Sequence, residues 1–97
     1  MEVGATKGLN HLTKQKLLAK IQNNTTSIRY NDFVALIKAY GFKRTHSNGS
    51  HEIYRRQDIP DIVNIQNDNG KAKSYQVKQF LSIIEKYNLK LEDDSHV

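Results

Sequence analysis

Residues 41–56 read GFKRTHSNGSHEIYRR, and this stretch marks a change from helical to extended structure. From Phe42 onward the spacing of apolar and polar residues changes from a period of about 3.6 to a period of about 2, which is typical of a half-buried strand. Asn48-Gly49 favours a two-residue type I′ turn, because Asn and Gly best tolerate the positive φ that this turn requires. The sequence therefore predicts a β-hairpin with strands over residues 42–46 and 51–56.

Three segments with helical spacing surround the predicted hairpin. Thr13 caps a predicted helix over residues 13–22, and a second helix runs from residue 30 or 31 to a left-handed stop at Gly41. Ser74 caps the last predicted helix, which continues to about Tyr87. Each helix has one apolar stripe: Leu17, Leu18 and Ile21; Phe33, Val34, Ile37 and Tyr40; and Val77, Phe80, Leu81 and Ile84.

A short third strand is predicted after Pro60, at Ile62, Val63 and Ile65, and it ends at the turn residues 67–70. The predicted element order is α-α-β-β-β-α. Since each helix has a single stripe to bury, we expect the helices to cover one face of a three-stranded antiparallel sheet. The fold class is a two-layer α+β domain whose other sheet face is open.

The length of 97 residues fits one domain, because a chain of this size buries enough surface to fold without cross-links. Cysteine is absent, which excludes disulfides, thiolate metal sites and cysteine nucleophiles. No stretch has the apolar run of a signal peptide or a membrane span, so we expect a cytoplasmic protein with no membrane contact. Within the domain we distinguish a mobile leader (1–11), an additional N-terminal helix with its linker (12–27), a core (28–90) and an acidic tail (91–97).

The net charge of +5 is distributed unevenly along the chain. Basic residues are in excess over residues 1–60, whereas Glu92, Asp93 and Asp94 offset them near the end. A basic domain with an acidic tail favours an anionic partner such as nucleic acid. The alternative is a basic surface that is merely solvated.

His51 is the candidate catalytic residue, because it leaves the predicted turn at a fixed position and direction. Lys43 and Arg44 precede the turn, and Arg55 and Arg56 follow it, so the imidazole lies in a positive field suited to a phosphate. An imidazole can take or give a proton near neutral pH, which attack of an RNA 2′-hydroxyl on the adjacent phosphate requires.

Strand alternation places His51 and Ile53 on one face of the sheet and Glu52, Tyr54 and Arg56 on the other. The alternative interpretation of His51 is therefore an ordinary histidine at the margin of the core.

Lys43 and Arg44 are candidates for binding the substrate's phosphates, and four further residues are candidates for the same role. Gly49 and Ser50 belong to the turn, where the hydroxyl either donates to phosphate or serves the turn itself. Lys71 and Lys73 precede the N-terminus of the last helix, where free backbone N–H groups and basic side chains together hold phosphates. A solvated lysine pair is the alternative.

No metal or cofactor is expected. His11, His46 and His96 do not have the spacing of metal ligands. His46 and His51 lie on facing predicted strands, but no third ligand accompanies them.

The chain resembles the HicA-type toxins, a family of mRNA interferases from prokaryotic toxin–antitoxin pairs. The resemblance covers most of the core and depends on three segments: the helix end Ile37-Lys38-Ala39-Tyr40-Gly41-Phe42, the turn Gly49-Ser50-His51 followed by Ile53-Tyr54, and the run Gly70-Lys71-Ala72-Lys73 before Tyr75-Gln76-Val77. The chain differs at Glu52, where many members have a second histidine, and in its longer N-terminal helix.

The resemblance implies a fold like that of double-stranded-RNA-binding domains, metal-independent cleavage of RNA, an essential histidine at His51 and a HicB-type antitoxin that covers the active face. The expected function is thus an endoribonuclease that cleaves mRNA, either monomeric or in a small complex with its antitoxin. Two alternatives stay open: a non-catalytic RNA-binding module of the same fold, and an adaptor whose open sheet face binds protein alone.

Overall fold

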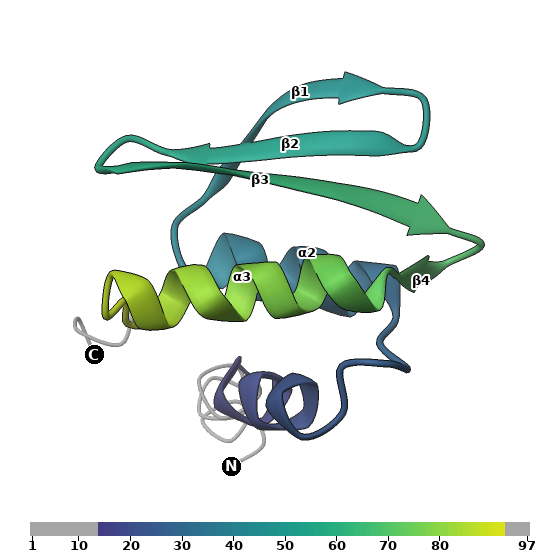
Figure 1. Cartoon of the computed structure of the whole chain (residues 1–97), viewed down its shortest axis with the longest axis horizontal. Coiled ribbons are helices and arrows are strands. Elements are labelled where there is room, and N and C mark those ends of the chain that lie inside the picture. The colour runs from purple at the N-terminus through teal and green to yellow at the C-terminus, as the bar shows by residue number, and fades with distance from the viewer. Residues whose placement is uncertain (1–13, 93–97) are drawn as a thin grey trace, which may run out of the picture.

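The sheet contains four antiparallel strands in the order β1-β2-β3-β4. A computed structural model of the chain describes residues 14–92. The strands are β1 (Lys43–Asn48), β2 (His51–Arg56), β3 (Ile59–Asp68) and the very short β4 (Lys71–Ala72). Figure 1 shows the sheet as one layer and helices α2 (Tyr30–Ala39) and α3 (Ser74–Lys86) as a second layer along one of its faces. The predicted α+β class and the open sheet face are therefore confirmed.

The prediction of three strands was wrong, because a fourth strand follows β3. Asn69 and Gly70 both have positive φ, 54° and 85°, which is the pattern of a type I′ turn. This turn folds β4 back onto the end of β3, where Asn67 pairs with Ala72 and Asp68 with Lys71. An Asn-Gly turn therefore joins β3 and β4, where the sequence indicated only the end of a strand.

The third strand is also longer than predicted, since β3 begins at Ile59 and includes Pro60. Among the described residues only the end of β3 has a strand on its outer side, because β4 pairs with Asn67 and Asp68 alone. Proline, which lacks an N–H group, is tolerated at the first residues of such an edge strand.

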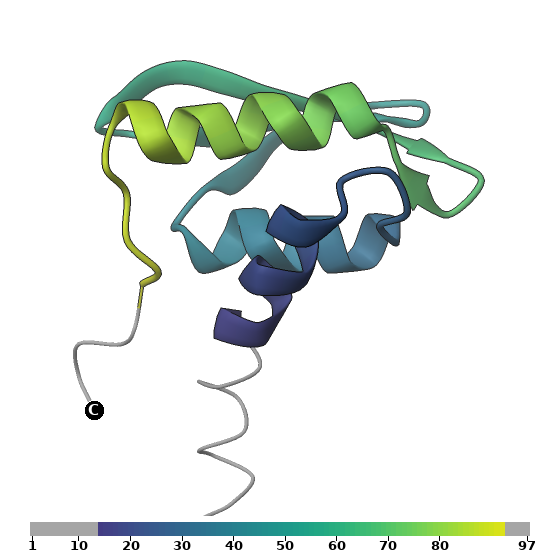
Figure 2. The ribbon, with the colours of Figure 1, turned by 60° about the horizontal axis from the view of Figure 1, so that its bottom comes forward.

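The helices form where the sequence predicts them. α2 ends before Gly41, whose φ of 89° is accessible mainly to glycine and whose N–H donates to the carbonyl of Lys38. A further helix over residues 14–23 lies against the helix layer, on the side away from the sheet (Figures 1 and 2). Its predicted cap, Thr13, lies outside the described residues, as do the predicted leader and the residues after Glu92.

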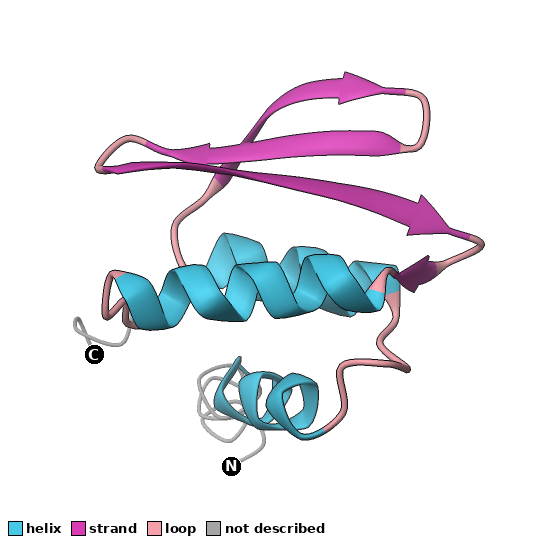
Figure 3. Cartoon of the chain, in the orientation of Figure 1, coloured by secondary structure: helices cyan, strands magenta, loops and turns pink. Residues whose placement is uncertain are grey.

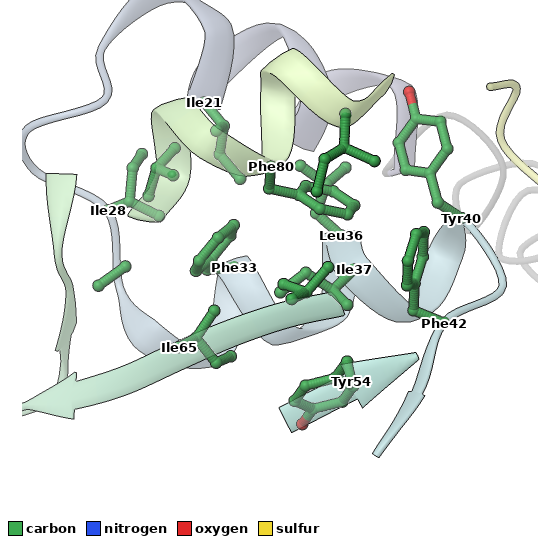
Figure 4. Packing of buried hydrophobic residues seen from close by; sticks show 14 of the residues in the cluster. Ile21, Ile28, Phe33, Leu36, Ile37, Tyr40, Phe42, Tyr54, Ile65 and Phe80 are labelled. Atoms are coloured by element: carbon green, nitrogen blue, oxygen red, sulfur yellow. The ribbon is translucent and has the colours of Figure 1, made fainter. Parts of the chain in front are cut away.

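Phe80 of α3 is at the centre of the core (Figure 4). Its ring makes edge-to-face contacts with Phe33, Tyr40 and Phe42, with centroids 6.0, 5.9 and 5.5 Å away. Ile21 of the N-terminal helix is also fully buried in the same cluster. The additional helix thus belongs to the same core as the sheet.

A buried glutamine links α3 to the sheet. The side-chain oxygen of Gln76 accepts a hydrogen bond of 2.9 Å from the backbone N–H of Gln66, at the point where β4 no longer covers β3. The backbone group thereby has a partner inside the protein.

Figure 3 shows where the helices lie in the chain. Within residues 14–92, none of them is long and apolar enough to span a membrane.

Candidate active site and nucleic-acid interface

The hairpin turn lies one residue later than the sequence predicts. Asn48 ends β1 and pairs with His51, so the two turn residues are Gly49 and Ser50. Gly49 has a φ of 64°, whereas neither Asn48 nor Ser50 has a positive φ. A positive φ at the first turn position alone is the pattern of a type II′ turn, in which glycine is preferred there. The type I′ assignment of Asn48-Gly49 was therefore wrong, although the hairpin itself is confirmed.

His51 is the first residue of β2, and its side chain is exposed. Its neighbours across the sheet are Asn48 of β1 and Gln66 of β3. Ile53 follows on the same face, and its partner on β1 is His46. Residues two positions away on a neighbouring strand lie about 7–8 Å apart, so His46 is a diagonal neighbour of His51 on the open face.

Glu52 and Tyr54 point to the opposite face, as the alternation predicts. Glu52 accepts hydrogen bonds from the hydroxyls of Tyr30 (2.7 Å) and Tyr54 (3.0 Å) and from the guanidinium of Arg44 (3.1 Å). The Tyr30 hydroxyl is the main reason that the pKa of Glu52 lies below its usual value, and the bonds from Tyr54 and Arg44 add to the effect. Burial, followed by the bond to Glu52, raises the pKa of Tyr54 to about 12. At neutral pH the carboxyl group of Glu52 is therefore ionised and the hydroxyl of Tyr54 is neutral.

Two of the predicted phosphate-binding residues lie away from the turn. Lys43 pairs with Arg55, at the other end of the hairpin, four residues or about 13 Å along β2 from His51. Arg44 pairs with the inward-facing Tyr54 and binds Glu52. The sequence pattern implied that Lys43 and Arg44 lie close to His51. The structure does not bring them together with His51.

The other predicted residues do lie near the turn. The carbonyl of Ser50 accepts a hydrogen bond of 3.0 Å from the N–H of Asn67, and Asn67 pairs with Ala72 on β4. Two strand spacings, about 10 Å, therefore separate the turn from β4, where Lys71 lies. Lys73 follows as the N-cap residue of α3 and forms an ion pair of 3.7 Å with Asp68.

Sequence reasoning missed two residues of this basic cluster. A hollow at the N-terminus of α3 is lined by Lys71, Lys73, Lys78 and Tyr75 together with Thr26, Asp68, Ala72 and Ser74. Tyr75 is 58% exposed, which is unusual for a tyrosine next to the core. The helical spacing of Lys78, four residues after Ser74, was the signal that could have found it, because it places the lysine on the first turns of α3.

The fold and this site define a small basic α+β domain that presents an exposed histidine at a hairpin turn, beside a lysine cluster at a helix N-terminus. The family model described as the HicA toxin of bacterial toxin-antitoxin matches residues 30–86, more than half of the chain. The chain therefore belongs to the HicA toxin family and is the toxin of a toxin–antitoxin pair, which implies an antitoxin partner. The match begins at the first residue of α2 and ends at the last residue of α3, so the helix over residues 14–23 lies outside it. No match was found among the curated proteins or the solved structures.

Proposed function

We propose that this toxin is a metal-independent endoribonuclease that cleaves mRNA in the cytoplasm, with His51 as a general acid or base. The observation that carries the proposal is the exposed position of His51 at the exit of the hairpin turn, in a chain of the HicA family. An exposed imidazole on an open sheet face is accessible to a polymer substrate.

Cleavage of RNA through its 2′-hydroxyl needs two proton transfers. A base removes the proton from the 2′-oxygen as this oxygen forms a bond to phosphorus, and an acid protonates the 5′-oxygen as its bond to phosphorus breaks. His51 supplies one of these groups, and His46 is the residue we assign to the other, since it lies diagonally from His51 on the same face. The products are a 2′,3′-cyclic phosphate and a free 5′-hydroxyl.

The residues around the turn hold the phosphates in this proposal. Lys71 and Lys73 supply charge, and the N-terminus of α3 supplies backbone N–H groups, because its N-cap residue has no side-chain hydrogen bond to them. Gly49 and Ser50 approach the substrate next to His51. Lys43, at the far end of the hairpin, extends the contact along the RNA, whereas Arg44, the other predicted residue there, is held on the inner face by Glu52.

An antitoxin of the HicB type is the proposed partner. We expect it to cover the open face around His51, since an active ribonuclease must be blocked in the cell that makes it. An interface of standard size, which buries roughly 1,600 Å², is large enough to cover the turn on a domain this small.

A non-catalytic RNA-binding module is the second candidate. The lysine cluster around the exposed Tyr75 favours it, because basic residues beside an exposed aromatic ring bind single strands without any chemistry. Only the enzyme depends on His51 for something other than affinity. A protein-binding adaptor, the third candidate, requires no RNA affinity at all.

The deciding experiment incubates the purified protein with a long unstructured RNA in EDTA. We expect cleavage by the wild type and by Ser82→Ala, an exposed position on α3, but not by His51→Ala. Cleavage that requires a metal ion would contradict the metal-independent mechanism. RNA binding without cleavage by the wild type would favour the binding module, and absence of both would favour the adaptor.

A further inference from the structure

The outer edge of β3 is free over much of its length. β4 pairs only with Asn67 and Asp68, so residues 62–66, the free edge, have no strand on that side among the described residues. These five residues carry no charge. The opposite edge of the sheet, β1, carries Lys43 and Arg44, and charged side chains of this kind discourage an edge strand from pairing with other chains. The free edge of β3 lacks that protection.

The backbone of the free edge has hydrogen-bonding groups that point away from the sheet. The N–H of Gln66 points outward, where it donates a 2.9 Å hydrogen bond to the side chain of Gln76 on α3. Successive residues of a strand direct their backbone groups to opposite sides, so those of Asn64 and Ile62 also point outward. The N–H and carbonyl groups of these two residues have no hydrogen-bond partner in the described part of the chain. Two donors and two acceptors are therefore free, with the spacing that an added strand uses.

α3 runs alongside the free edge and forms one wall of a groove (Figure 1). The groove has a volume of about 430 Å³, and its lining includes residues 61–64 of β3 and the apolar Phe80 and Ile83 of α3. Asp61, near one end, accepts a hydrogen bond of 2.6 Å from the hydroxyl of Tyr87. An extended segment beside β3 would direct every second side chain toward α3, so the groove favours apolar side chains at these positions.

We infer that the free edge of β3 binds an extended segment of the antitoxin, which adds to the sheet as a further strand. Such a segment satisfies the outward backbone groups, because its own N–H and carbonyl groups alternate with the same spacing. It also covers Ile62, a large hydrophobic residue that is 42% exposed. The inference rests on the antitoxin partner of the proposed function and not on the cleavage of RNA.

A second copy of the toxin fits this edge less well than a single strand does. The α3 helix of that copy would lie along its own β3 in the same way, so two helices would have to share the space beside one pair of strands. Each copy also has a net charge of +5, which opposes their association. A segment without a helix beside it can lie next to β3 and above α3.

The free edge leads toward the site around His51. Gln66, the last residue of the free edge, is the neighbour of His51 across β2 and β3. Beyond Gln66 the edge is occupied by β4, so a bound segment must leave it there. Two strand spacings, about 10 Å, separate that point from β2. The same antitoxin chain can therefore pair with β3 and cover the open face around His51.

The first test is amide hydrogen exchange, measured by NMR in the free toxin and in the toxin–antitoxin complex purified from the native host. The amides of Ile62 and Asn64 should exchange rapidly in the free toxin and at least about tenfold more slowly in the complex. The amides of Val63 and Ile65 face β2 and should be protected in both samples. Equal exchange of Ile62 and Asn64 in the two samples would overturn the inference. Protection that rises with the concentration of free toxin would also overturn it, because a second copy would then occupy the edge.

The second test compares two substitutions of Asn64, whose side chain is exposed. Asn64→Pro removes the outward N–H, which the sheet itself does not use. The loss should weaken antitoxin binding at least about tenfold, since the hydrogen bond is lost and the proline ring also obstructs the added strand. Asn64→Ala keeps the N–H and should bind within about twofold of the wild type. Equal affinities of the two variants would mean that the backbone of the edge does not bind the antitoxin.

RNA cleavage separates this inference from the proposed function. Asn64 takes no part in the proposed RNA site, so both variants should cleave RNA at the wild-type rate, which also shows that Asn64→Pro is folded. If Asn64→Pro does not fold, the hydrogen-exchange comparison, which uses the wild-type chain, decides. Absence of cleavage by the wild type would contradict only the proposed function, since hydrogen exchange and antitoxin affinity are measured without RNA.

Discussion

His51 has a position that allows its chemical role to be separated from its contribution to binding. Because the side chain is exposed, His51→Ala should leave the fold intact. We expect cleavage to fall by at least about 10²-fold, whereas the free energy of RNA binding changes by less than about 1 kcal/mol. Single-turnover cleavage and equilibrium binding of the same RNA measure the two effects. Unimpaired turnover by the variant would end the assignment.

Glu52 should make the stability of the protein depend on pH. Its pKa is lowered in the folded state, chiefly by the Tyr30 hydroxyl. The stabilisation is therefore fully present above the ordinary glutamate value and is lost as the pH falls through the lower folded value. Glu52→Gln should lower the free energy of unfolding by roughly 1.5–3 kcal/mol at pH 7, the range for hydrogen bonds to a charged group.

Urea denaturation at pH 7 and at pH 3 measures this difference. The gap between Glu52→Gln and the wild type should narrow at the lower pH, where the wild-type carboxyl is also becoming protonated. Glu85→Gln is the matched control, because the exposed side chain of Glu85 has no hydrogen-bond partner among the described residues. A gap that stays constant with pH would contradict the role of the Glu52 charge.

The sequence offers His51 as the candidate catalytic residue but gives no sign of the cluster around Glu52. The Gly-Ser-His turn and its basic neighbours are local signals, which a linear chain displays directly. Tyr30 and Glu52, in contrast, are 22 residues apart, and their contact depends on how α2 packs on the sheet. The sequence around Glu52 therefore gives no indication that this side chain binds two tyrosines and an arginine.

At the scale of single elements, the turn between β1 and β2 differs from the sequence-based assignment because local preferences do not fix its register. A two-residue turn centred on Asn48-Gly49 or on Gly49-Ser50 satisfies local preferences about equally. The observed register includes a bulge between Arg44 and His46, which places Arg44 on the inner face beside Tyr54. There Arg44 reaches Glu52, so a contact between strands selects the register that turn chemistry leaves open.

Gly49 should be sensitive to substitution through its backbone alone. A Cβ atom at this position would meet no atom within 4 Å, yet the φ of 64° is strained for any residue with a side chain. We expect Gly49→Ala to destabilise the protein by roughly 1–2 kcal/mol in a urea titration. Ser50→Ala, at the next position without a positive φ, should have a much smaller effect. Equal effects of the two changes would show that the turn is not of the type described.

The N-terminus of α3 should contribute affinity without sequence preference. Changing Lys71 and Lys73 together to Ala removes two of the charges next to its free N–H groups. Binding should weaken alike for all single-stranded RNAs, and the slope of log affinity against log salt should flatten by roughly 0.7 for each phosphate that is no longer neutralised. A matched variant, Lys16→Ala with Lys90→Ala, removes the same charge elsewhere on the surface and should keep the slope. An unchanged slope in the first variant would show that its lysines are only solvated.

At the scale of the whole molecule, hydrophobic periodicity predicted the layers correctly because each helix has one stripe to bury. Phe33 and Phe80 lie on the predicted stripes and meet in the core. The two-residue strand β4 was not predictable in this way, since a periodic pattern needs more residues than β4 has. The distribution of charge was visible only as a trend along the chain. The fold separates it into a lysine cluster near His51 and a second basic groove at the far end of the hairpin.

This separation leads to a prediction about the antitoxin. A partner that inhibits the toxin by covering His51 must also meet the lysine cluster at α3, because the turn and β4 are only two strand spacings apart. Carboxylates of the antitoxin would occupy the positions of RNA phosphates there, so RNA and antitoxin should compete for the toxin. Competition is measured by titrating the antitoxin into a toxin–RNA complex formed with the non-cleaving His51→Ala variant.

The wild-type complex provides the complementary measurement. In the toxin–antitoxin complex His51 should be protected from chemical modification of its imidazole, whereas in the free toxin, where the side chain is exposed, it should react readily. Salt should weaken the binding of RNA to the toxin more than it weakens the binding of the antitoxin, because a protein interface also buries apolar surface that ions do not screen. A complex that binds RNA as tightly as the free toxin, with His51 still reactive, would show that inhibition does not occur by covering this face.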